Sequence, residues 1–146
     1  MEQILDYPVA EKRALDYAGF GIRFVAVLID GIILQVVQVP LSFMFYGEYS
    51  FGNENIGLTL VSLFIRLTYT VLMQSSKTQG TLGKMAVGIK VGDENGNRIS
   101  AMNALGRYFA TILSTIVLFI GYLMVIWDDK KQGLHDKLAG TYVFKS

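Results

Sequence analysis

The sequence of 146 residues contains no cysteine, a single histidine and few charged side chains. Without cysteine the chain forms no disulfide, no thiolate nucleophile and no thiolate metal site. One histidine, His135, is too few for a histidine-cluster metal site within one chain. The formal net charge of +1 gives no sign of a nucleic-acid partner. We therefore expect no metal, no cofactor and no nucleic acid.

Sequence motifs of catalysis are missing as well. The chain has no Walker loop, dinucleotide fingerprint or nucleophile motif, and "GIKVGDENG" matches no phosphate loop. The N-terminal stretch 1–21 is acidic where a cleaved signal peptide requires positive charge, so we interpret it as a retained polar lead-in. We expect a protein that is not an enzyme.

Apolar residues are abundant. They make up 52% of the chain, and Lys, Arg, Asp and Glu only 17%, against roughly 25% charged residues in a typical globular protein. Three runs reach the length of about 20 apolar residues that crosses a bilayer. We predict one mainly α-helical membrane domain, residues 1–146. Its expected segments are three membrane helices (22–46, 56–76 and 104–127), a hairpin loop (77–103) and a polar tail (128–146).

The loop between the second and third helices carries a strand pattern. Val87, Ile89 and Val91 alternate with small or polar residues, which is the period of a half-buried strand. The following "DENGN" contains Asn-Gly, a strong hairpin signal. The C-terminal "GTYVFKS" alternates similarly. We predict a small β-hairpin joined by a C-terminal strand.

The orientation follows from the distribution of Lys and Arg. The N-terminal flank and the loop 77–103 carry basic residues, whereas "GEYSFGNEN" between the first two helices has none. The positive-inside rule then places the N-terminus and the loop in the cytoplasm. A spanning third helix would leave the lysine-bearing tail outside. We favour a re-entrant pair, bent near Ser114-Thr115 or Gly121, which returns the tail to the cytoplasm.

Two charges lie in the first membrane helix. An ionisable residue inside a bilayer costs about 2.5–3.5 kcal/mol on insertion scales. Arg23 lies at the helix entrance, where its long side chain can snorkel to the headgroups. Asp30 follows seven residues later, roughly 10 Å deeper and nearly on the same face. Its carboxyl group must be protonated, paired or in contact with water.

Arg66, in the second helix, lies at a depth comparable to that of Asp30. We predict that these two residues form an ion pair, or share a polar cluster with Gln35 or Gln38. In the structural interpretation, which we favour, the pair only locks the two helices together. In the functional interpretation, Asp30 is a proton or cation site whose pKa is set by Arg66.

The polar tail holds further acids. Asp136 adjoins His135, but neighbouring side chains on a helix diverge, so this dipeptide alone indicates little. Asp128 and Asp129 follow Trp127 directly, which is typical of an interfacial cap with an aromatic anchor.

Several motifs together resemble the RDD family of small membrane proteins. They are Arg23, Asp30, the stretch "TQGTLGKMAVGIKVGDENGNRIS" and the final "QGLHDKLAGTYVF", in this order over about residues 16–144. The family is named for one arginine and two aspartates. The resemblance implies that Arg23 and Asp30 are the arginine and the first aspartate. Asp136 is our choice for the second, with Asp128 as its competitor.

The resemblance leaves two functions open, because some relatives are similar to sodium/proton antiporters and others look like accessory subunits. In the first hypothesis the protein moves a small cation such as Na⁺ against H⁺, with Asp30 as the exchanging carboxylate. Arg66 or Arg23 would lower its pKa, and Gln35 and Gln38 would offer neutral oxygens. Because so short a chain can enclose little of a transport pathway by itself, we expect a homo-oligomer or a membrane protein partner. The alternative is a non-transporting scaffold. Either would be a multi-pass protein of a bacterial cell (inner) membrane, with its N-terminus in the cytoplasm.

Overall fold

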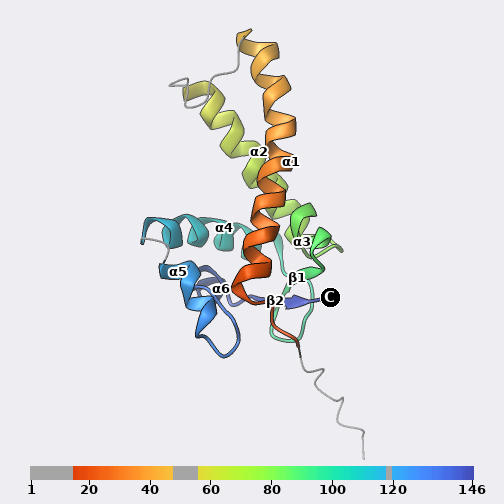
Figure 1. Ribbon diagram of the computed structural model, residues 1–146, viewed down its shortest axis with the longest axis vertical. Coiled ribbons are helices and arrows are strands. Elements are labelled where there is room, and N and C mark those ends of the chain that lie inside the picture. Colours follow the sequence, from red (N-terminus) through yellow and green to blue (C-terminus); the bar gives the residue numbers. More distant parts are fainter. Residues whose placement is uncertain (1–14, 48–55, 118–119) are drawn as a thin grey trace, which may run out of the picture.

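Two long helices project from a compact end of the molecule (Figure 1). The computed structural model describes residues 15–47, 56–117 and 120–146. Helix α1 (Phe20–Tyr46) contains Pro40, and helix α2 (Ile56–Ser75) follows it in the chain. The stretches Phe20–Phe45 and Ile56–Ser75 are long and apolar enough to cross a membrane. Very few of their residues are fully buried inside the protein, as expected of helices that are solvated by lipid.

The third apolar segment does not form a straight span. Helix α4 (Ala101–Ile116) is followed by helix α5 (Ile120–Leu123) and a 3₁₀ turn, η1 (Met124–Ile126). The two parts meet at an angle of 113°. Gly121 makes this return tight, because a Cβ there would lie 2.8 Å from the Cβ of Ser114 on α4. The break between α4 and α5 lies between the two predicted positions, so the predicted bend is confirmed, and the bent pair has the geometry of a broken span or a re-entrant loop.

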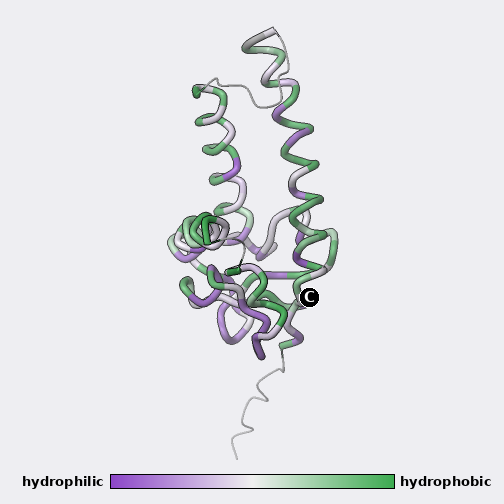
Figure 2. The backbone as a smooth tube through the Cα atoms, turned by 60° about the vertical axis from the view of Figure 1, so that its left-hand side comes forward, coloured by the Kyte–Doolittle hydropathy of each residue, from purple (hydrophilic) through white to green (hydrophobic). Residues whose placement is uncertain are grey.

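Helix α4 has its polar side turned inward. It lies across the direction of α1 and α2, and the second view looks nearly along it (Figures 1 and 2). Ala104, Arg107, Ala110 and Ser114, three or four residues apart, are buried. The opposite face exposes large apolar side chains, among them Met102, Phe109, Ile112 and Ile116. An apolar outer face combined with a polar inner face is the pattern of a helix in contact with lipid.

A two-stranded sheet lies at the compact end. Strand β1 (Ile89–Gly92) pairs antiparallel with strand β2 (Tyr142–Lys145), with Val91 opposite Val143. Two of the three predicted strands, the first arm of the hairpin and the C-terminal strand, are therefore confirmed. The "DENGN" turn also forms, since Asp93 N donates to Asn97 O at 3.0 Å. The residues after this turn form no second hairpin strand, however, because Ser100 caps α4 only three residues later.

The core lies where the start of α1, the sheet and α4 meet. Its buried members are Ala18, Ala26, Ile89, Val91, Ile99, Ala104 and Val143. Ala18 N donates to Val143 O at 2.9 Å, which joins the start of the described chain to its last strand. The segment before α1, the loop after α2 and the C-terminal tail therefore lie at the same end of the two long helices.

Candidate functional site

Asp136 is the centre of a buried ion-pair network. It lies in the short helix α6 (Leu134–Ala139) and has no exposed surface. Its Oδ1 accepts from Arg107 Nε at 3.0 Å and Nη2 at 2.6 Å, and its Oδ2 accepts from Arg23 Nη1 at 2.5 Å and Gly133 N at 3.1 Å. Burial favours the neutral acid, but the charges of Arg107 and Arg23 outweigh it and hold the pKa of Asp136 well below its usual range.

The two arginines bind further acceptors. Arg23 Nε donates to Ala18 O at 2.9 Å and its Nη2 donates to Lys131 O. Arg107 Nη1 donates to Gln74 Oε1 on α2 at 2.7 Å. The network therefore joins α1, α2, α4 and α6. The predicted snorkelling of Arg23 is wrong, since its side chain is only 11% exposed and turns toward an acid 113 residues away.

Asp30 forms a second polar centre, on α1. Its carboxylate accepts from Tyr69 Oη at 2.8 Å, Thr81 Oγ1 at 2.5 Å and Gly83 N at 2.8 Å. Gly83 lies in the short helix α3 (Leu82–Ala86). Only glycine fits there, because a Cβ would lie 2.2 Å from Ala26 O and 2.7 Å from Asp30 Cγ. Asp30 thus holds α3 against α1.

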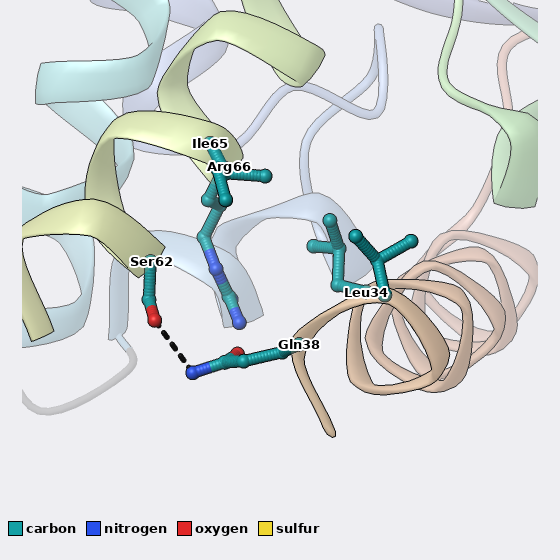
Figure 3. A pocket seen from close by; sticks show the side chains of 6 residues that line it. Leu34, Gln38, Ser62, Ile65 and Arg66 are labelled. Atoms are coloured by element: carbon teal, nitrogen blue, oxygen red, sulfur yellow. Dashed lines mark hydrogen bonds between the residues drawn. The ribbon is translucent and has the colours of Figure 1, made fainter. Parts of the chain in front are cut away.

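The predicted ion pair between Asp30 and Arg66 is wrong for the residues that the structure describes, because no salt bridge joins them. Arg66 is exposed and extends beside Gln38 in a small pocket (Figure 3). Two residues at similar depth in neighbouring helices can point in different directions around their helices. The Asp30 carboxylate also already accepts hydrogen bonds from three neutral donors.

The predicted cluster of Asp30 with the two glutamines is also wrong. Gln38 Nε2 donates to Ser62 Oγ on α2 at 2.6 Å (Figure 3). Gln35 is exposed and lines neither this pocket nor the larger cavity that contains Asp30. Gln35 and Gln38 follow Asp30 by five and eight residues. They therefore lie roughly one and a half and two turns further along α1.

A cavity of about 510 Å³ separates the two polar centres and is the candidate site. Its walls come from α1, α2, α4, α5 and the segments that carry α3 and α6. Its polar lining consists of Arg23, Asp30, Arg66, Tyr69, Thr70, Gln74, Thr81, Lys84, Arg107, Tyr108, Thr111, Thr115, Tyr122 and His135. The volume is that of a small-molecule site, for which about 300–1,000 Å³ is usual.

Lys84 and His135 carry perturbed pKa values at this cavity. Burial, together with the charges of Arg107 and Arg23, lowers the pKa of Lys84 to about 7, against the opposing effect of Asp30 and Asp136. The Lys84 side chain is half-buried and lines the cavity. Burial lowers the pKa of His135 to about 4, so the imidazole is neutral at pH 7.

The interpretation that the His135–Asp136 dipeptide indicates little is wrong. His135 Nε2 lies 3.5 Å from Asp136 Oδ1, and both side chains are buried. Asp128, the competitor for the second aspartate, lies outside the network and bonds Lys137 Nζ at 2.5 Å near the surface. The hydrogen bond with Lys137 lowers the pKa of Asp128.

Sequence reasoning missed Arg107, Lys84 and Tyr69 as site residues. Arg107 carried a usable signal, because it is a charge inside an apolar run, as Arg23 is. The only sequence signal for Lys84 was its place in the motif "TLGKMAVG". Tyr69 gave no sequence signal, since tyrosine is common in membrane helices and nothing marks which tyrosine bonds an acid.

Comparison with known proteins identifies one family and several relatives. The model of the RDD family matches residues 17–140. The uncharacterized protein YxaI of Bacillus subtilis (strain 168) is 39% identical over 145 residues, covering 86% of this chain and 95% of the relative. The uncharacterized membrane protein YteJ of the same organism is 30% identical over 152 residues, covering 92% and 84%. No solved structure matches the chain.

Proposed function

This chain belongs to the RDD family, and from that premise we propose that it is a transport protein, or a component of one, whose cavity receives a small ionised solute. The observation that supports the proposal is the cavity of about 510 Å³ between two lipid-facing helices, with charged side chains in its wall. Ionisable residues at membrane depth commonly mark the pathway of a solute.

A purely structural role does not account for all of these charges. Asp136 neutralises part of the charge of Arg23 and Arg107. Lys84 and Arg66 also line the cavity, and neither has a hydrogen-bonded acceptor within residues 15–47, 56–117 and 120–146. Cations held near a bilayer without a fixed partner are costly. A solute that enters the cavity would supply the partner.

We propose that the protein lies in the bacterial cell membrane, with α1 and α2 crossing the bilayer. The compact end faces the cytoplasm in this proposal. Lys77, Lys90 and Arg98 lie at this end, whereas the opposite end carries "GEYSFGNEN", which has no Lys or Arg. The positive-inside rule supports this orientation.

One form of transport is the exchange of a cation for protons, with Asp30 as the carboxylate that binds each in turn. Its support is that Asp30 lines the cavity. The carboxylate would have to release the hydroxyls of Tyr69 and Thr81 to bind Na⁺. Purified protein in liposomes, with a pH-sensitive dye inside and a sodium gradient outside, tests it. The expected result is sodium-dependent proton flux that Asp30→Asn abolishes and Asp128→Asn leaves unchanged.

A non-transporting scaffold is the second candidate. Its support is that Asp30 and Asp136 each hold together segments that are far apart in the chain, while the outer faces of α1 and α2 are uncovered. A second copy or a membrane partner would cover these faces. In this case liposomes show no flux of sodium, proton or organic anion, while light scattering of the detergent complex reports more than one protein chain.

A further inference from the structure

We propose that the solute of this cavity is anionic: a carboxylate or phosphate group carried by a short apolar chain, with Lys84 as its principal counter-charge. The inference rests on the proposed function and names the class of solute. It departs from cation exchange, because the contacts of the cavity wall favour the opposite sign of charge.

The charge of the cavity wall is the first argument. Four cationic side chains line it, namely Arg23, Arg66, Lys84 and Arg107, against the single carboxylate of Asp30. Behind the wall, Asp136 compensates one further charge. With all four cations charged, an excess of two positive charges remains. Because opposite charges attract strongly where water is scarce, this site favours an anion and repels a metal cation.

The state of Asp30 is the second argument. Three donors, two of them hydroxyls and one a backbone N–H, already satisfy its carboxylate. A cation ligand needs lone pairs that point into the cavity, and three of the roughly four lone-pair positions of this carboxylate are already in use. Lys84 is in the opposite condition, because its ammonium group has donors but no hydrogen-bonded acceptor within the parts of the chain that the structure describes.

The apolar part of the wall determines the rest of the solute. Beside the charges lie Phe20, Phe24, Val27, Leu34 and Leu123. A bare inorganic anion would leave these side chains against water. An anion that carries a short hydrocarbon chain would cover them, and each CH₂ group that it buries would favour binding. Two sources of such a ligand exist, an anionic lipid and a water-soluble organic anion.

Binding of an anion should be coupled to uptake of a proton. With a pKa of about 7 in the empty cavity, Lys84 is about half protonated at pH 7. An anion beside the amine stabilises its charged form and raises the pKa. His135 is neutral at this pH, and Lys84 is the lysine that lines the cavity, so the proton goes to Lys84. The groups that face Lys84 are Arg107 on α4, Arg23 and Asp30 on α1, and His135 and Asp136 on α6.

Titration calorimetry of the full chain in an uncharged detergent tests this proposal. The probes share one tail and differ in charge: hexyl phosphate, hexanol and hexyltrimethylammonium. We expect hexyl phosphate alone to bind, at pH 7, with net uptake of up to about half a proton, measured from buffers of different ionisation enthalpy. Equal binding of hexanol and hexyl phosphate would overturn the proposal.

Variants at position 84 separate charge from proton uptake. Lys84→Gln should weaken hexyl phosphate binding about tenfold or more, because it removes a charged hydrogen-bond donor. Lys84→Arg should keep binding but lose proton uptake, which a merely structural role would not produce. The matched control is Lys77→Gln, an exposed lysine just after α2, with unchanged binding. Wild-type affinity in Lys84→Gln, or unchanged proton uptake in Lys84→Arg, contradicts the assignment.

Lipid nanodiscs distinguish the two sources. Competition by phosphatidylglycerol, absent with phosphatidylcholine, identifies an anionic lipid as the occupant, and binding that is equal in both identifies a water-soluble anion. Loss of hexyl phosphate binding in both lipids would contradict the site. Sodium-dependent proton flux without anion binding would preserve the proposed function and remove this inference, whereas no flux and no anion binding would remove both.

Discussion

Replacing Asp136 by asparagine should strongly destabilise the folded protein. Asparagine keeps the shape of the side chain but removes its negative charge and replaces one acceptor oxygen by a donor NH₂. The carboxylate is fully buried and accepts four hydrogen bonds, three of them from Arg23 and Arg107. The variant would leave two nearly buried guanidinium groups without a counter-charge.

The size of this effect follows from the burial. Removing one partner of a buried ion pair costs about 3–5 kcal/mol. In a chain of this length each kcal/mol shifts the thermal midpoint by about 2–4 °C, so we expect a fall of about 6–20 °C. The control is Asp128→Asn, whose partner Lys137 has a side chain that is 42% exposed. A pair of this kind contributes at most about 1 kcal/mol.

Circular dichroism of the helices during heating, in one detergent at pH 7, measures both variants. If Asp136→Asn melts within 2 °C of the wild type, or no lower than Asp128→Asn, the network does not stabilise the fold as described. Where the single variant cannot be purified, Arg107→Gln combined with Asp136→Asn gives a second measurement. The double variant should lose less stability than the sum of its two single changes, because the two residues interact directly.

Four further measurements test other contacts. Asp30→Asn should lower the free energy of unfolding by about 1–3 kcal/mol, since its amide cannot accept from all three donors, and chemical denaturation would show it. Gly83→Ala should separate α3 from α1 and lower the melting temperature, whereas Gly106→Ala, on an open face of α4, should raise it slightly. The pKa of Lys84 is about 7 when folded and about 10.4 when unfolded. The unfolded chain therefore binds more protons between these values, so stability should rise with pH across them and lose this slope in Lys84→Met. The pKa of Asp136 is lowered by folding, so its contribution should persist above about pH 4, decline as the pH falls further, and be absent in Asp136→Asn.

The features of the fold that depend on a local pattern of residues could be predicted from the sequence. The two long helices follow from length and apolarity, and β1 follows from the alternation around Ile89 and Val91. The second arm of the hairpin was predicted wrongly, because the capping residue Ser100 ends the extended stretch early. The pairing of β1 with β2 joins positions 50 to 56 residues apart, and only the shared alternating pattern indicated it.

Much less of the candidate site could be predicted from the sequence. Depth along a helix predicted that Asp30 and Arg66 lie at similar height, and both do line one cavity. It did not predict where the side chains point. The neutral partners Tyr69 and Thr81 carry no charge pattern that would mark them as partners of an acid. Arg107 was not predicted as a site residue, because its acceptor lies 29 residues further along the chain.

The contact between Arg23 and Asp136 also constrains the order in which the protein is assembled. The two residues are separated by 113 positions. A ribosome that adds about 5–20 residues per second needs roughly 6–23 s to make this stretch. During this interval Arg23 lacks the Asp136 carboxylate that neutralises it in the folded protein. Helix α1 is therefore held in place by a helix that is synthesised 113 residues later.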